Sequence, residues 1–196
     1  MKNLTKSTLI SFITLLIFVG CGEDGVTTSF TDDASLESAL KIPNSTILEA
    51  INVARAERRN CYDGRGVVGP SSALTWSSEL YASAYEHSSD LAKSDTFSHI
   101  GSGTKTDVTG SNIGRASKFN ERIRANGYIG YSIIGENIAG GQSSIESALK
   151  AWLESPAHCR NIMEAEFLEI GVAVFVNPDS KYGIYWTQNF GSKQFN

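Results

Sequence analysis

Three residues of this sequence stand in polar settings that could carry chemistry: His99, Glu136 and His158. Two imidazoles and one carboxylate are a plausible ligand set for zinc or another divalent cation, with water as the fourth ligand. The same groups could act in general acid–base catalysis, because imidazole titrates near neutral pH. The spacing also fits a third interpretation, in which two polar histidines and a glutamate simply line loops.

Other kinds of reactive site find less support. The sequence contains no HExxH motif, no paired-cysteine zinc motif and no G-x-S-x-G nucleophile elbow. Cys159 stands beside His158, which suggests a thiol nucleophile, but Cys61 offers it a disulfide partner instead. The remaining histidine, His87, falls within a helical pattern beside Glu86, so we expect a half-buried structural residue there.

Helices and strands must position these side chains, and the hydrophobic periodicity predicts both. Two capping boxes, Thr46–Glu49 and Ser143–Glu146, indicate where two helices begin. Helical patterns cover about residues 46–59, 78–93, 118–125 and 143–155, with a loop over 99–117. Alternating patterns predict a strand over 169–176, a turn over 177–180, a return strand over 182–190 and a further strand over 131–134.

The strand over 169–176 decides the expected fold class. It is apolar on both faces, so both faces must be covered. The helices that precede and separate the strands provide that cover, which predicts an α/β layered sandwich. The length of 196 residues and the hydrophobic content of 41% fit one domain plus tails.

Charge and the first residues indicate export. Lys2 and Lys6 are the only charged residues among the first 22, and an apolar run follows over 9–19, so we expect residues 1–20 to be a signal peptide. The uncharged stretch is shorter than the ~18–20 residues of a membrane-spanning helix. Without this segment the chain has 15 basic and 21 acidic residues, a net charge of −6 instead of −4. This balance argues against a nucleic-acid partner.

The cysteines have separate expected roles. Phe18-Val19-Gly20-Cys21 resembles the bacterial lipobox, which predicts lipidation of Cys21 and a membrane anchor; the alternative is plain secretion with a free thiol. Residues 21–42 are rich in Gly, Ser, Thr and acidic side chains and predict a flexible tether, which leaves 43–196 as the domain. In an exported chain, the two cysteines left over, Cys61 and Cys159, are expected to form a disulfide.

Several short motifs follow one another along residues 45–191. They are Ile51-Asn52-Val53-Ala54-Arg55, Leu74-Thr75-Trp76-Ser77, Phe97-Ser98-His99, Arg122-Ile123-Arg124-Ala125-Asn126-Gly127-Tyr128, Gly135-Glu136-Asn137-Ile138-Ala139, Ala151-Trp152-Leu153-Glu154-Ser155-Pro156-Ala157-His158, Ile170-Gly171-Val172-Ala173 and Tyr185-Trp186-Thr187-Gln188-Asn189-Phe190-Gly191. Together and in this order they resemble the CAP superfamily (cysteine-rich secretory proteins, antigen 5, pathogenesis-related 1) in its bacterial form.

The resemblance implies a three-layer α-β-α sandwich and a central cleft that in many members is lined by two histidines and two acidic residues and sometimes holds a metal. In many eukaryotic members the second acid stands three residues after the helix tryptophan, where this sequence has Ser155 after Trp152. Glu154 stands one residue early, about 100° around a helix. The cleft residues expected on this resemblance are His99, Glu136, His158, Glu154 and Ser155.

Two functions are compatible with that cleft. The first is a lipid-anchored binding module on the cell envelope, which presents the cleft to a small apolar ligand such as a lipid or sterol, to an envelope component or to a protein partner. The second is a metal-dependent, peptidase-like hydrolase in which His99, His158 and Glu136 hold zinc or another divalent cation. The fourth acid and a recognisable nucleophile are missing, which favours the binding module.

Overall fold

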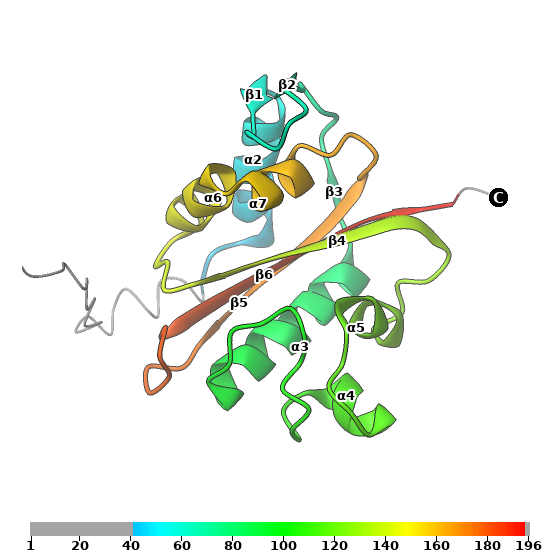
Figure 1. The fold of residues 1–196 in the computed structure, drawn as a ribbon, viewed down its shortest axis with the longest axis vertical. Helices are drawn as coiled ribbons and strands as arrows, with labels where there is room; N and C mark the ends of the chain where they lie inside the picture. The colour runs from blue at the N-terminus through cyan, green and yellow to red at the C-terminus, as the bar shows by residue number, and fades with distance from the viewer. Residues whose placement is uncertain (1–40, 195–196) are drawn as a thin grey trace, which may run out of the picture.

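The computed structural model describes residues 41–194. A four-stranded sheet has the order β3-β5-β6-β4, and a separate pair of short strands, β1 and β2, lies at one end (Figure 1). The strands are β1 (Arg59–Asn60), β2 (Val67–Val68), β3 (Thr75–Trp76), β4 (Tyr131–Gly140), β5 (Glu169–Val176) and β6 (Ile184–Lys193). The edge strand β3 runs parallel to β5, whereas β6 runs antiparallel to both of its neighbours, β5 and β4.

Helices cover both faces of the sheet. The helices are α2 (Asn44–Arg55), α3 (Ser78–Ser94), α4 (Val108–Ile113), α5 (Phe119–Ala125), α6 (Ile145–Glu154) and α7 (Pro156–Ile162). Figure 1 shows α2, α6 and α7 on one face and α3, α4 and α5 on the other. The arrangement confirms the expected three-layer α-β-α sandwich.

The long helix α3 and the strand β5 match their predicted ranges, but six other elements differ. The helix α2 begins at Asn44 after Pro43, before the expected cap at Thr46, and ends at Arg55. The cap of α6 is Ser144, one residue after the predicted Ser143. Residues 99–117 include α4, whose cap Asp107 accepts the N–H of Gly110. The helix α7 and most of β4 were not predicted, and β6 extends to Lys193.

The core lies on both sides of the sheet. On the α2–α6–α7 side, Trp152, Trp186 and Phe190 are buried in one cluster. Every residue of β6 except the last is buried, because helices lie over both of its faces. Gly171 allows α3 to lie directly against β5: a Cβ at this position would stand 2.0 Å from the Tyr81 nitrogen.

The predicted disulfide is confirmed. Cys61 and Cys159 are bonded, with their Cα atoms 5.5 Å apart, and both are buried. The bond ties the segment after β1 to α7, the helix that carries His158. It also excludes Cys159 as a free thiol nucleophile.

The expected signal peptide over 1–20, the lipidation site Cys21 and all but the last two residues of the tether over 21–42 lie outside the described residues. Among residues 41–194, no helix combines the length and apolar character needed to cross a membrane.

Candidate functional site

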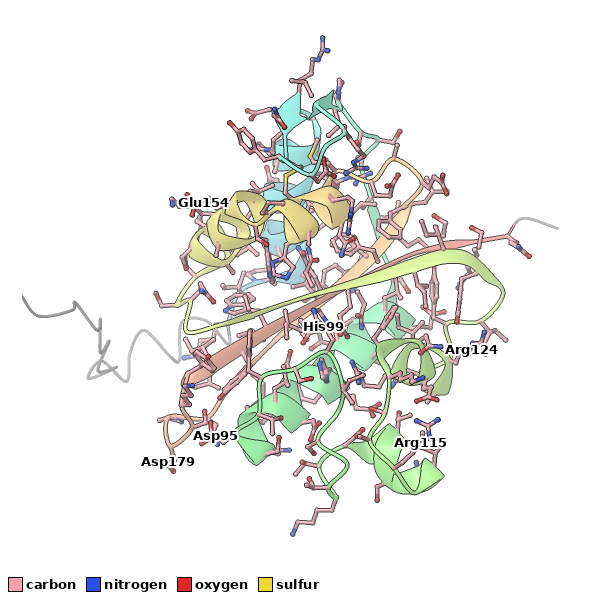
Figure 2. The ribbon with its side chains drawn as sticks, in the orientation of Figure 1. Asp95, His99, Arg115, Arg124, Glu154 and Asp179 are labelled. Carbon is pink, nitrogen blue, oxygen red and sulfur yellow. A yellow bond between two sulfur atoms is a disulfide. The ribbon has the colours of Figure 1, made fainter. Side chains whose placement is uncertain are left out.

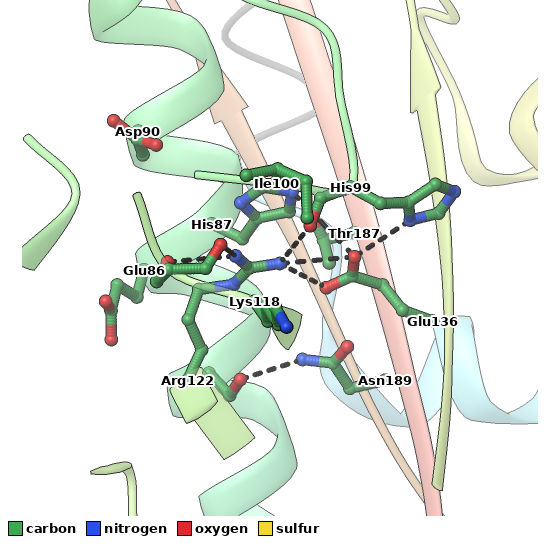
Figure 3. Close-up of polar contacts among 12 residues, drawn as sticks. Glu86, His87, Asp90, His99, Ile100, Lys118, Arg122, Glu136, Thr187 and Asn189 are labelled. Carbon is green, nitrogen blue, oxygen red and sulfur yellow. Dashed lines mark hydrogen bonds and ion pairs between the residues drawn. The ribbon is translucent and has the colours of Figure 1, made fainter. Parts of the chain in front are cut away.

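The centre of the site is Glu136, a buried carboxylate on β4. Arg122 of α5 is also buried and donates from Nη2 to both of its oxygens, at 3.2 Å to Oε1 and 3.0 Å to Oε2 (Figure 3). The opposite strand supplies Asn189, which faces Glu136 in register. With its amide turned so that both ends are satisfied, Asn189 donates to Glu136 Oε2 at 3.2 Å. The carboxylate is therefore matched by a counter-charge inside the protein.

Arg122 also fixes the backbone that presents His99. Its Nη2 donates to the His99 carbonyl oxygen at 3.0 Å, and its Nη1 donates to the Ser117 carbonyl and hydroxyl oxygens at 3.2 and 3.0 Å. A planar guanidinium can make several such bonds at once in a fixed geometry. One side chain thus binds the carboxylate and both ends of the loop between α3 and α5.

His99 connects the buried pair to the surface. Its Nδ1 lies 2.9 Å from Glu136 Oε1, and its side chain is 48% exposed. Since an ionised carboxylate only accepts hydrogen bonds, Nδ1 carries the proton in this contact. In the neutral ring, Nε2 is then left as an acceptor for an incoming group.

His87 lies under this pair, deeper than the sequence predicted. The ring is fully buried, its Nε2 donates to the Ser98 carbonyl oxygen at 2.9 Å, and the same atom lies 3.9 Å from Glu136 Oε1. Burial lowers the pKa of His87 to about 4; the charge of Glu136 opposes this shift and that of Arg122 reinforces it. His87 is therefore neutral near pH 7.

The same neighbours determine the ionisation of Glu136. Burial by itself would raise the pKa of Glu136. His87, the hydrogen bond from His99 and the Arg122 guanidinium outweigh that effect and hold the pKa below its ordinary value. Because His87 is neutral at pH 7, Arg122 provides the full positive charge that keeps Glu136 ionised there.

His158 stands beside this group on α7. It is half-buried; burial lowers its pKa, and the charge of a protonated His99 lowers it further. Two amides fix α7 to β4: Asn137 donates to the His158 carbonyl oxygen at 3.2 Å, and Asn161 donates to the Glu136 carbonyl oxygen at 3.2 Å. The structure thus brings the two predicted imidazoles near one another, with Glu136 bonded to the first.

Glu154, expected in the cleft on the family resemblance, faces solvent in the structure. It forms an ion pair with Lys150 one turn earlier, and its side chain is 63% exposed. Figure 2 shows it on the outer side of α6, away from His99. Its place in the helix explains the difference, because the inward face of α6 is occupied by Trp152, whose Nε1 donates to the Ile138 carbonyl. Ser155 lies at the junction of α6 and α7, and its part in ligand binding stays a prediction.

The predicted zinc or other divalent-cation site does not fit this arrangement. Both oxygens of Glu136 already accept hydrogen bonds from Arg122, and His99 donates to one of them. A cation beside them would also be repelled by the guanidinium. Within residues 41–194, no group of three or more His, Cys, Asp or Glu side chains is placed to hold a metal ion. In the described arrangement, His99, His158 and Glu136 therefore do not fit together as a three-ligand metal centre.

Two reactive groups near the imidazoles, Glu136 and Cys159, are already engaged. Glu136 is ionised and neutralised, and Cys159 is oxidised. In the described part of the chain, neither His99 nor His158 has a hydroxyl or thiol group as a side-chain hydrogen-bond partner, so no nucleophile is paired with a base. The site therefore consists of the His99 and His158 imidazoles and the buried ion pair between Arg122 and Glu136.

Sequence reasoning missed the two residues that set the electrostatics. Arg122 was considered only as part of a motif, and His87 only as a structural helix residue. A signal for Arg122 was present: it stands beside Ile123 and three residues after Phe119, on the side of a short helix that should face the core. A buried arginine requires a buried acceptor, and Glu136 in a strand of the same domain was the available acid.

Comparison with known proteins agrees with this geometry. The profile of the Cysteine-rich secretory protein family, CAP, matches residues 48–190. The uncharacterized Bacillus subtilis protein YkwD is 42% identical over 65 residues, which are 33% of this chain and 23% of that protein. The uncharacterized Bacillus subtilis membrane protein YlbC is 26% identical over 117 residues, 60% of this chain and 28% of that protein. This chain thus matches less than a third of the length of either relative.

Two solved structures share the fold. An extracellular protein containing an SCP domain from Bacillus anthracis has a TM-score of 0.56 and 25% identity, over 76% of this chain and 40% of that one. An outer surface protein from Borrelia burgdorferi has a TM-score of 0.53 and 19% identity, over 78% of this chain and 97% of that one. The match to the second shows the fold alone.

Proposed function

Since this chain belongs to the Cysteine-rich secretory protein family, CAP, we propose that it is an exported binding module whose recognition surface surrounds His99 and His158. The observation that carries the proposal is the ion pair between Arg122 and Glu136. It removes Glu136 from the role of base or metal ligand, and it holds the His99 loop in a fixed position. Binding benefits from such a preformed surface, because less ordering is needed on association.

The neighbours of His99 indicate the chemistry of the partner. Phe97 is 43% exposed and Ile100 is 47% exposed, so two apolar side chains stand close in sequence to the open imidazole. Phe97 is supported by Tyr182, with ring centroids 5.0 Å apart. Apolar groups beside hydrogen-bonding groups are typical of recognition surfaces. An envelope component or a protein partner fits this mixed surface, and a small apolar ligand is the further candidate.

The expected location supports this role. The related chain from Bacillus anthracis is described as extracellular and the one from Borrelia burgdorferi as an outer surface protein. We propose that residues 1–20 direct export, that Cys21 carries the lipid anchor and that residues 21–42 hold the domain near the membrane. Replacement of Cys21 by Ser should move the protein from the membrane fraction to the soluble fraction and abolish labelling by a fatty-acid analogue.

Site-specific cross-linking in intact cells tests the recognition surface. A photoreactive amino acid at Ile100 should yield a discrete cross-linked product that disappears in the His99→Ala/His158→Ala variant. The matched control is the same photoreactive group at Ile129, which is 66% exposed and stands after α5. An identical product from both positions, or a product at Ile100 that survives the double substitution, would contradict the proposal.

A further inference from the structure

A second site lies along α3, apart from the residues around Glu136. A cavity of about 730 Å³ runs beside this helix, and none of the side chains that contact Glu136 lines it. Tyr81, Tyr85 and Lys93 form a stripe of α3 along one side, since they are spaced four and eight residues apart. Residues 105–108 form the facing wall, and Asn126 at the end of α5 closes one end.

The facing wall is held in place by two acidic residues of α3. Asp90 is buried and accepts hydrogen bonds from the Thr106 hydroxyl at 2.6 Å and from the Ser102 N–H at 2.8 Å. One turn earlier, Glu86 accepts from the Thr109 N–H and from the Asn126 amide, each at 2.7 Å. These bonds bracket residues 105–108 on both sides, so the cavity is a built feature of the fold.

The lining also contains two lysines that could meet an anionic ligand. Both oxygens of Glu86, the only acid in the lining, are engaged by hydrogen-bond donors. Lys93 and Lys105 line the cavity, and neither forms an ion pair within residues 41–194. Lys93 instead lies over the Phe175 ring, with Nζ 4.9 Å from the centroid. The lining thus carries two lysines and one glutamate, in a chain whose net charge is −4.

Aromatic rings supply the rest of the surface. Tyr81 packs against Trp76 with ring centroids 5.7 Å apart, and Tyr85 packs against Tyr81 at 6.3 Å and against Phe175 at 5.8 Å. Tyr85 is nevertheless 46% exposed, so part of this row is open to a ligand. Aromatic faces favour other flat rings, and lysine favours an anion at their border.

We propose that this cavity binds a small aromatic acid. Its ring system lies along Tyr81 and Tyr85, and its acidic group is paired with Lys93 or Lys105. The volume falls within the range of about 300–1,000 Å³ that is usual for small-molecule sites. The proposal does not depend on the recognition surface around His99, because the two sites share no lining side chain.

Calorimetric titration of the full-length chain with 4-biphenylcarboxylate and its neutral counterpart 4-biphenylmethanol tests the proposal. We expect the acid to bind with a Kd below about 1 mM and roughly tenfold more tightly than the alcohol. The Lys93→Met/Lys105→Met variant should bind the acid as weakly as the alcohol. Lys181→Met is the matched control, since Lys181 also lies over a ring, that of Tyr182 at 5.3 Å, but outside the cavity.

A filled cavity gives an independent test. Ala82 belongs to the lining, and Ala82→Trp keeps both lysines while occupying the space, so binding of the acid and of the alcohol should both be lost. An unchanged far-UV circular dichroism spectrum shows that the variant is folded. The His99→Ala/His158→Ala variant should bind the acid normally. Equal affinity for acid and alcohol, retention of acid binding by folded Ala82→Trp, or no binding to the unaltered chain would each overturn the proposal.

Discussion

Two buried carboxylates in this protein, Glu136 and Asp107, are stabilised in different ways. Glu136 faces the guanidinium of Arg122 and the imidazoles of His99 and His87. Asp107 accepts four hydrogen bonds from neutral donors: the N–H groups of Gly103, Gly110 and Ser117, and the Ser117 hydroxyl. Burial opposes the ionisation of both, yet these contacts hold the pKa of each below its ordinary value.

The difference distinguishes a structural acid from an acid that supports the proposed recognition surface. The donors to Asp107 come from a loop and a helix terminus, so its negative charge organises the chain around itself. Glu136 lies under an imidazole that is 48% exposed, so its charge affects what His99 offers to solvent. Ser117 joins the two centres, because its hydroxyl donates to Asp107 and accepts from Arg122.

Loss of the counter-charge should have the largest effect. Arg122→Met leaves Glu136 buried without its cation, and we expect the free energy of unfolding at pH 7 to fall by about 3–5 kcal/mol. Arg122→Met/Glu136→Leu removes both charges and should recover at least about 1 kcal/mol of that loss. Urea denaturation of the three proteins measures both values. A single variant as stable as the unaltered chain would show that the ion pair is dispensable.

Acid should weaken the Glu136 region before the Asp107 region. The pKa of His87 is about 4 in the folded protein, below its ordinary value of 6.5, so the unfolded chain binds the proton first as the pH falls. The contribution of neutral His87 to the free energy of unfolding is fully present above about pH 6.5. This contribution should decrease by about 3 kcal/mol as the pH falls to 4. Asp107 contributes nothing in this window, because its pKa is lowered from 3.8.

Denaturation of the His87→Gln variant between pH 7 and pH 4 isolates that contribution. The variant should show a much smaller decrease, with the remainder due to His158, whose pKa is shifted in the same direction, and to acids such as Glu136 as the pH approaches 4. Asp107→Asn should retain the full decrease over the same range. If His87→Gln keeps the pH dependence of the unaltered chain, the loss of stability toward pH 4 cannot be assigned to His87.

Neutralising Asp107 should have a smaller effect than removing Arg122. Asp107→Asn keeps one acceptor oxygen but turns the other into a donor that faces the N–H groups of the loop. We expect a loss of about 2 kcal/mol in the free energy of unfolding, measured by urea denaturation at pH 7. The loss is smaller because this substitution leaves no unpaired charge. A loss equal to or larger than that of Arg122→Met would contradict the expected order of the two effects.

The exposed pair of Glu154 and Lys150 should have the smallest effect. Glu154→Gln breaks an ion pair between adjacent helical turns in which both side chains are more than half exposed. The expected change in the free energy of unfolding is at most about 0.5 kcal/mol, and cross-linking from Ile100 should be unchanged. Loss of that cross-link in the folded variant would restore Glu154 to the recognition surface.

The sequence predicted the helices and strands whose apolar residues recur with a regular period. The two-sided apolar run of β5 and the long periodic pattern of α3 determine their own boundaries, and the count of cysteines led to the correct disulfide. Short elements were less accessible. The helix α7 has seven residues and begins with Pro156. It is too short for a helical repeat of apolar residues to be recognised in the sequence, although it holds His158.

Hydrophobic periodicity could not predict which side chains pair within the site. Spacing along the chain says nothing about which acid meets which base when α5 and β4 come together. The motif that contains Arg122 was identified, but its partnership with Glu136 depends on tertiary contact. For Glu154 the motif suggested the cleft, but the offset of one residue already implied a rotation of about 100° around the helix, and the side chain faces outward.

The disulfide has a topological consequence for the proposed exported role. The bond between Cys61 and Cys159 closes the chain into a covalent ring that contains His87, His99, Arg122, Glu136 and His158. A protease that cuts once within this ring, for example in the exposed turn at Gly64–Gly66, opens the circle without releasing a fragment. The recognition surface and its charged base therefore stay on one connected molecule after a single cleavage between the two cysteines.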